Sequence, residues 1–115
     1  MTLEELRDQI DVLDRQLVEL LSERARAAQL VGRLKASTSL PVYEPEREKV
    51  VYSNVRAANK GPLPDIELTH IYERIIDVMR ALQRNELASE RNARAAASDK
   101  SAGAENTTTE IGNEP

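Results

Sequence analysis

An all-helical fold is predicted by three features of the sequence. Apolar residues recur every three or four positions along two long stretches, which is the spacing of one buried helix face. Leu, Ile, Val and Ala supply nearly all the apolar mass, because the chain has no Phe, Trp or Cys and only three Tyr. Two short segments that contain proline, 37–43 and 60–64, divide the chain into three parts. We therefore expect one domain with a long, a short and a medium helix.

The first helix is predicted from Leu3 to about Ala36. Thr2 and Glu5 have the spacing of a capping box, in which each side chain binds the backbone amide of the other residue. Gly32 lies inside the pattern and indicates either close packing or simple tolerance of a glycine. The apolar face is formed by Leu3, Leu6, Ile10, Leu13, Leu17, Leu20, Ala27, Val31 and Leu34.

This helix is too long for a compact monomer. Thirty-four residues span about 51 Å, whereas a globule of 87 residues has a radius of gyration of about 12 Å. The apolar face must therefore be covered by something other than the chain's own core, and a second copy of the chain is the simplest cover. We expect an intertwined homodimer.

The second helix is predicted to open at Glu44-Pro45-Glu46, since proline suits the first helical turn, and to end near Asn59. Residues 60–64 (KGPLP) are predicted to form a turn, after which Asp65 is suited to cap a third helix. The apolar spacing of the third helix fades around residues 86–87.

The composition changes from residue 88 to Ala, Ser, Asn, Thr, Gly and charged residues. Such a segment has too little apolar surface to offset the entropy of ordering it. We therefore expect a helical domain over residues 1–87 and a disordered, low-complexity tail over residues 88–115.

Composition excludes several functions. The net charge is −4, without the basic surface that nucleic-acid binding needs, and no apolar run is long enough to span a membrane. An acidic, amphipathic N-terminus is unlike a secretory signal, which favours the cytoplasm. Four scattered glycines make no phosphate-binding loop, and the single histidine, His70, is expected at the surface. Catalysis by a thiol, a metal cluster or a serine triad is not predicted.

Arg24 occupies a position of the first helix where the pattern calls for an apolar residue. A guanidinium keeps its charge, so a buried one needs an anionic partner. That partner is either a glutamate in the core, which would fix the packing, or a ligand. Lys35 follows eleven residues later, about 20° around the helix and about 16 Å along it. It either faces the same groove or is a solvated lysine at the helix end.

Arg7 lies beside the apolar face at the other end of the helix, about 25 Å from Arg24. One subunit cannot bring both to a small ligand, but an antiparallel partner subunit can. The alternative is a surface arginine paired with Asp11.

Two further groups of polar residues lie next to predicted apolar faces. Glu44, Arg47 and Glu48 share the first turn of the second helix, where the helix dipole by itself favours carboxylates. Gln83 lies one turn beyond Met79, either at the edge of the core or in a pocket.

The order and spacing of these residues resemble the all-helical (type II) class of chorismate mutases. The stretches that carry the resemblance are LRDQIDVLDRQLVELLSERARAAQLVGRLK (6–35), PVYEPEREKVV (41–51) and IIDVMRALQ (75–83), within residues 3–87. The resemblance implies an intertwined dimer of three-helix chains. It also implies an isomerase of aromatic amino-acid (Phe/Tyr) biosynthesis in the shikimate pathway, which rearranges chorismate to prephenate without a cofactor or metal.

The resemblance also implies roles for single residues. Arg24 and the partner subunit's Arg7 would bind the two carboxylates of the substrate. Lys35 would donate to a carboxylate and to the ether oxygen, Gln83 would donate to the ether oxygen, and Glu48 would accept from the ring hydroxyl. Glu44 and Arg47 would lie close to the substrate. The catalytic residues are then Lys35, Gln83 and Arg24, and the substrate-binding residues are Arg7, Arg24, Lys35, Glu44, Arg47, Glu48 and Gln83.

The sequence departs from the family at two positions. Glu44 stands where many members have Asp. Met79 stands where some carry a small hydroxyl residue, and because a thioether cannot donate to a carboxylate, Met79 is left out of the catalytic set.

Two alternative functions remain open at this stage. Isochorismate pyruvate lyase uses the same fold, although Glu48 suits the hydroxyl of the mutase substrate. The second alternative is a non-catalytic helical dimerisation or regulatory module. Fusion or docking to another enzyme of the aromatic pathway is compatible with catalysis and is also left open.

The amide of Gln83 predicts the pH dependence of the reaction. A glutamine donates a hydrogen bond without being protonated, whereas a glutamate would have to be an acid. We expect the rate of chorismate conversion to be nearly flat from about pH 5 to about pH 8 in buffers of constant ionic strength. A steep loss over that range would contradict the assignment of Gln83.

Overall fold

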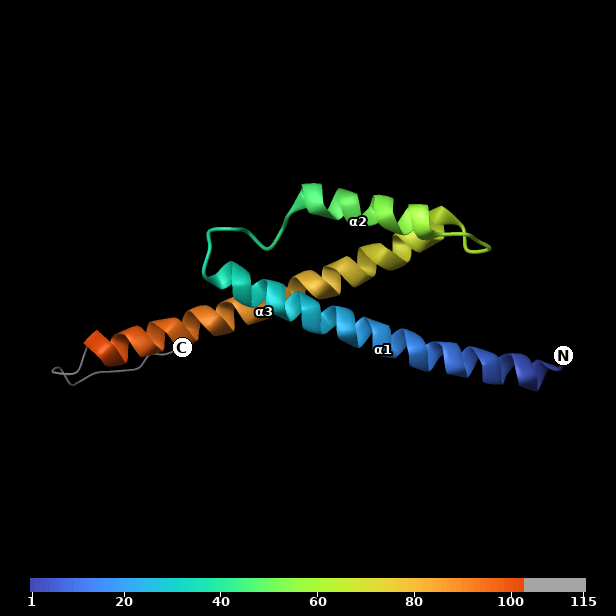
Figure 1. Ribbon diagram of the computed structural model, residues 1–115, viewed down its shortest axis with the longest axis horizontal. Helices are drawn as coiled ribbons and strands as arrows, with labels where there is room; N and C mark the ends of the chain where they lie inside the picture. Colours follow the sequence, from blue (N-terminus) through green and yellow to red (C-terminus); the bar gives the residue numbers. More distant parts are fainter. Residues whose placement is uncertain (103–115) are drawn as a thin grey trace.

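The computed structural model describes residues 1–102, and their side chains as far as Ser98. The helices are α1 (Leu3–Ala36), α2 (Pro45–Ala58) and α3 (Asp65–Ala102). In Figure 1, α1 and α3 cross, and α2 lies along the first part of α3. The prediction of an all-α, three-helix chain is confirmed, although α3, expected to be of medium length, is the longest helix, with 38 residues.

Helix α1 begins and ends as its sequence predicts. The Glu5 amide donates to Thr2 Oγ1 at 3.1 Å and the Thr2 amide donates to Glu5 Oε1 at 2.7 Å, which completes the capping box. At the other end the backbone amide of Ser37 donates to the Leu34 carbonyl. The predicted bounds of this helix are confirmed.

The segment from α2 to α3 differs from prediction at one residue. Pro45 is the first residue of α2 and Asn59 its C-cap, as expected. Asp65, however, is not an N-cap but the first residue of α3. Its carboxylate accepts a hydrogen bond from Asn59 Nδ2 at 2.8 Å. The side chain of Asp65 therefore stabilises the turn between α2 and α3 and does not cap α3. Gly61 has φ +74° in this turn, a conformation that favours glycine.

Helix α3 runs past the predicted end near residue 87, and the expectation of disorder is wrong for residues 88–102. Alanine is the best helix former, and the segment is rich in it. The extension also has contacts to α1: Arg94 Nη1 donates to the Ala36 carbonyl at 3.1 Å, where α1 leaves carbonyls unpaired. The rest of the predicted tail, residues 103–115, lies outside the described residues. The division of the chain into domains at residue 87 stays a prediction.

The core of the single chain is small and lies where α1 crosses α3. In the described part of the chain the buried hydrophobic side chains are those of Ala28, Ile76 and Met79. Gly32 lets the helices approach closely, because a β-carbon there would lie 2.8 Å from the Gln83 carbonyl oxygen. Close packing is therefore the correct interpretation of this glycine.

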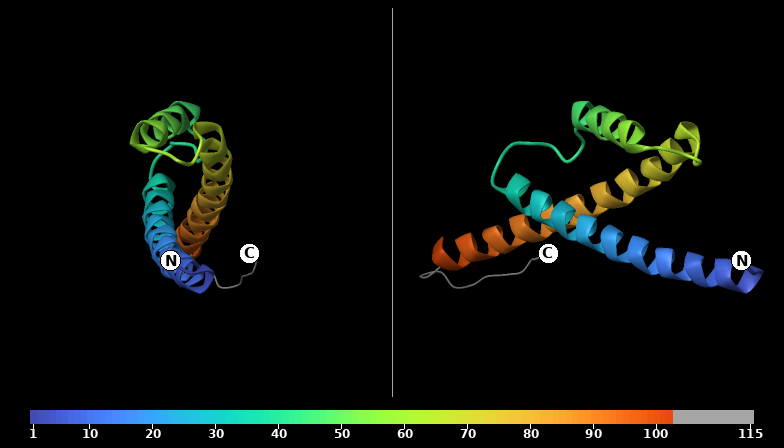
Figure 2. Two further views of the ribbon diagram at one scale, coloured as in Figure 1. Left: turned by 90° about the vertical axis from the view of Figure 1, so that its right-hand side faces the viewer. Right: turned by 45° about the vertical axis from the view of Figure 1, so that its right-hand side comes forward.

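The N-terminal half of α1 projects away from this core, as both Figure 1 and Figure 2 show. Its apolar residues Leu3, Leu6, Ile10, Leu13, Leu17 and Leu20 are between 43% and 62% exposed. The radius of gyration is 20.9 Å, against about 13 Å for a compact chain of 100 residues. Residues 1–102 therefore leave this face of α1 uncovered. Within residues 1–102, no helix combines the length and apolar character required to cross a bilayer.

Replacing Gly32 with alanine tests the close approach of α1 to α3. Helix propensity alone favours alanine by about 1 kcal/mol, but overpacking against the Gln83 backbone destabilises by about 1–3 kcal/mol. We expect Gly32→Ala to lower the thermal midpoint followed by circular dichroism. A higher midpoint would mean that the helix propensity of alanine outweighs the steric cost, and that α1 and α3 are not tightly packed at Gly32.

Candidate active site

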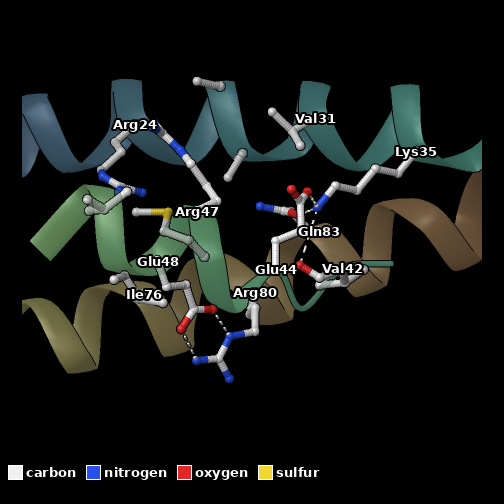
Figure 3. A pocket seen from close by; sticks show the side chains of 14 residues that line it. Arg24, Val31, Lys35, Val42, Glu44, Arg47, Glu48, Ile76, Arg80 and Gln83 are labelled. Carbon is white, nitrogen blue, oxygen red and sulfur yellow. Dashed lines mark hydrogen bonds and ion pairs between the residues drawn. The ribbon is translucent and has the colours of Figure 1, made fainter. Parts of the chain in front are cut away.

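A cavity of about 510 Å³ lies between α1, α2 and α3 (Figure 3). Its volume is within the range of small-molecule sites. The residues that line it come from α1, from the segment before α2, from α2 and from α3. They are Arg24, Ala27, Ala28, Val31, Lys35, Val42, Glu44, Arg47, Glu48, Val51, Ile76, Met79, Arg80 and Gln83.

Among residues 1–98, Lys35 is the most buried charged residue, with 5% of its surface exposed. Its Nζ donates to the Val42 carbonyl at 3.2 Å and to Gln83 Oε1 at 3.0 Å, and it pairs with Glu44 Oε1 at 2.7 Å. An ammonium has three donors, so each has a protein acceptor. Lys35 faces the groove, as one of the two interpretations predicted, and it is not a solvated residue at the helix end.

Glu44 is the N-cap residue of α2, but its side chain caps nothing. The helix dipole is thus not the whole reason for a carboxylate at this position. Its carboxylate forms an ion pair with Lys35, and 38% of the Glu44 side chain remains exposed. A carboxylate that is held at one oxygen and still reached by water can be exchanged for another anion.

Arg24 and Arg47 also line the cavity, from α1 and α2. Arg24 is partly buried on the inward side of α1. No ion pair or side-chain hydrogen bond joins either guanidinium to another group among residues 1–98. Within this part of the chain the alternative of a core glutamate for Arg24 is therefore not observed.

Glu48 lines the cavity but is already paired. Its carboxylate accepts from Arg80 through two parallel hydrogen bonds, Oε2 from Nε at 2.8 Å and Oε1 from Nη2 at 3.2 Å. In Figure 3 this pair lies on the side away from α1. The hydrogen bonds that Arg80 donates to Glu48, together with the negative charge of that carboxylate, raise the pKa of Arg80 above its ordinary value.

The amide of Gln83 is oriented by Lys35. Because its Oε1 accepts from the ammonium, its amide nitrogen remains a donor directed into the cavity (Figure 3). Met79 is 5% exposed and contributes an apolar wall. Gln83 is therefore in a pocket rather than merely at the edge of the core.

Arg7 is not part of this cavity. It lies near the free end of α1, where its side chain is 63% exposed and its Nη1 pairs with Glu4 at 3.3 Å, not with Asp11. One chain does not bring Arg7 and Arg24 together, as the spacing along the helix predicts. His70 is exposed beside Glu67, as expected of a surface histidine.

The charges of the lining suit a doubly negative molecule. Four cations (Arg24, Lys35, Arg47 and Arg80) face two carboxylates (Glu44 and Glu48), which leaves two positive charges in excess. Val31, Ile76 and Met79 add apolar surface to this lining. Such a cavity can bind a small dianion with an apolar body and hold it in one orientation.

The sequence interpretation missed Arg80 and the Val42 carbonyl. Arg80 is one helical turn after the buried Ile76, so a charge at a buried-face position was the signal that could have revealed it, as it revealed Arg24. The Val42 carbonyl belongs to the loop backbone, and the position of a loop cannot be read from periodicity.

Comparison with known proteins gives consistent results. The family model described as "Chorismate mutase type II" matches residues 6–84. A chorismate mutase of Methanocaldococcus jannaschii is 32% identical over 91 residues, which cover 78% of this chain and 92% of that protein. The solved structure of a chorismate mutase (form II) from Thermus thermophilus has a TM-score of 0.69 and 34% identity, and the match covers 70% of this chain and 92% of that one.

Longer relatives also match. The bifunctional chorismate mutase/prephenate dehydratase of Aquifex aeolicus is 37% identical over 86 residues, or 71% of this chain. The match covers only 24% of the length of that relative.

Proposed function

Because this chain belongs to the chorismate mutase type II family, we propose that it rearranges chorismate to prephenate. The observation that carries the proposal is the excess of two positive charges in the cavity, which matches a substrate with two carboxylates. The reaction breaks one carbon–oxygen bond and forms one carbon–carbon bond within one molecule. Folding the substrate and stabilising the charge that develops on the ether oxygen are sufficient for catalysis.

Arg24 is proposed to bind one carboxylate of the substrate. Its guanidinium has no ion-pair partner among residues 1–98, so an incoming anion displaces only water. A guanidinium and a carboxylate can form two parallel hydrogen bonds, which fix the orientation of the substrate as well as its position. Arg47, on the opposite wall, adds positive charge near the same space.

Lys35 is proposed to exchange Glu44 for a substrate carboxylate. Removing a buried ammonium from all its acceptors would be costly, but replacing one carboxylate with another keeps its charge compensated. The contacts of Lys35 to Val42 and Gln83 can persist during the exchange. The ammonium is then held close to the ether oxygen when negative charge develops there.

Gln83 is proposed to donate to the ether oxygen through its free amide nitrogen, and Glu48 to accept from the ring hydroxyl. Each oxygen of Glu48 uses one acceptor position for Arg80 and retains another. A donor to the ether oxygen binds more strongly as charge develops, so it accelerates the chemical step and not only substrate binding.

We propose that the functional unit is an intertwined homodimer. The exposed leucines of α1 need a cover, and the buried core of the single chain is too small to support a stable domain. An antiparallel partner would also carry its own Arg7 to the site that contains Arg24. Sedimentation equilibrium at micromolar concentration tests this proposal, and a monomer that converts chorismate would refute it.

Cytoplasmic localisation, and fusion or docking to another enzyme of the aromatic pathway, are also proposals. The second is supported by the bifunctional relative, of which the match spans 24%.

The Arg24→Leu variant tests whether Arg24 serves substrate binding or the stability of the fold. Losing the guanidinium that fixes the orientation of the substrate can cost about 100-fold in rate, whereas leucine at an apolar helix position retains or improves packing. We expect kcat/KM for chorismate, followed by ultraviolet absorbance, to fall by about 100-fold. The thermal midpoint should be unchanged or higher.

Two controls accompany the Arg24→Leu variant, a second substrate and a second arginine-to-leucine substitution. Isochorismate as a second substrate distinguishes the mutase from the lyase. Arg15→Leu, on the opposite face of α1 and away from the cavity, should keep full activity. If the wild type converts neither substrate and Arg24→Leu is only more stable, the chain is a structural module and the proposal is wrong.

A further inference from the structure

Arg80 joins α3 to α2 through the only doubly hydrogen-bonded ion pair among residues 1–98. Its Nε and Nη2 reach the two oxygens of Glu48 at 2.8 and 3.2 Å. The side chains are 26% and 19% exposed, so water weakens this pair less than it weakens a surface pair. The planar, two-pronged guanidinium fixes the plane of the carboxylate, which an ammonium cannot do.

The guanidinium of Arg80 has two further contacts. Its guanidinium carbon lies 5.2 Å from the centre of the Tyr43 ring, a cation–π distance. Its Nη2 also lies 3.4 Å from Asp77 Oδ1, one turn earlier on α3. Tyr43 belongs to the segment before α2, so Arg80 connects that segment, α2 and α3 at one point.

The position of Glu48 matters because unpaired cations lie nearby. Arg24 and Arg47 line the same cavity without an ion-pair partner among the described side chains. A glutamate free to rotate at this place would turn toward those guanidiniums and neutralise them. It would then compete with any anionic ligand, as Glu44 already does at Lys35.

We propose that Arg80 is a positioning residue that holds the Glu48 carboxylate apart from Arg24 and Arg47 and presents it to the ligand as a hydrogen-bond acceptor. This inference rests on the proposed function, because the ligand's hydroxyl is that of chorismate. Arg80 acts through Glu48 and is not assigned a contact with the substrate.

A double-mutant cycle tests this role, with kcat and KM for chorismate measured for the wild type, Arg80→Gln, Glu48→Gln and the double variant. Misplacement of a contact by about 1 Å can cost about 100-fold in rate, so we expect Arg80→Gln to lower kcat/KM by about 10–100-fold. In the Glu48→Gln background the same change should cost less than about twofold, because the residue it positions is already lost.

The conservative variant supplies a second readout. Arg80→Lys retains the positive charge but not the two parallel hydrogen bonds. It should recover part of the activity lost in Arg80→Gln, and it should raise KM more than it lowers kcat if the hydroxyl contact is already made in the bound substrate. If Arg80→Gln fails to fold, the cycle is run with Arg80→Lys instead.

Asp77→Asn is the matched control, since it removes only a long contact of Arg80 to a side chain that is 52% exposed, which contributes little, and leaves the pair with Glu48 intact. Its activity should equal that of the wild type. If the losses from Arg80→Gln and Glu48→Gln simply multiply in the double variant, Arg80 only holds α2 in place and the inference is wrong. A wild type that does not convert chorismate refutes the proposed function itself, whereas an active wild type with multiplying losses refutes only the role of Arg80.

Discussion

The straightness of α1 is the constraint on which the rest of the molecule depends. A continuous helix of 34 residues cannot fold back to cover its own leucines or to bring its first turns to the cavity at its other end. Within the described residues, α1 therefore has an uncovered apolar face at one end, and at its other end lies a cavity whose Arg24 and Arg47 have no ion-pair partner. A partner subunit is proposed to cover the apolar face, and a doubly negative substrate is proposed to occupy the cavity.

The contacts of the buried Lys35 ammonium preorganise the site in the absence of a ligand. Its three acceptors come from the loop, from the start of α2 and from α3. Gly32, one turn earlier, lets α1 approach α3 closely enough for the contact to Gln83. The charge is fully compensated in the free protein, yet Glu44 remains exposed enough to be exchanged. Preorganisation of this kind limits the rearrangement that the site needs when it binds a ligand.

Sequence reasoning was most successful where side-chain chemistry and helical period act together. The helices follow from apolar spacing, and Arg24, Lys35, Glu44, Arg47, Glu48 and Gln83 all line one cavity, as expected from their positions beside apolar faces. Their roles toward a substrate stay predictions. The predicted end of α3, near residue 87, was too early because the low apolar content of the following segment outweighed the helix propensity of its alanines in the prediction. The hydrogen bond from Arg94 to Ala36 also joins residues 58 positions apart, and such a contact does not show in a local sequence pattern. The pairing of Glu48 with Arg80 was missed for a similar reason: it depends on the angle at which α2 meets α3, and the turn between them sets that angle.

Hybrid dimers provide the most direct test of a site shared between two subunits. Arg7→Ala and Arg24→Ala chains are each expected to be nearly inactive, because each homodimer lacks one guanidinium in both sites. After the two are mixed and allowed to exchange subunits, about half of the dimers should be hybrids with one intact site, so activity should return to about a quarter of that of the wild type. If the mixture stays as inactive as its components, Arg7 and Arg24 do not act across an interface and the account is wrong.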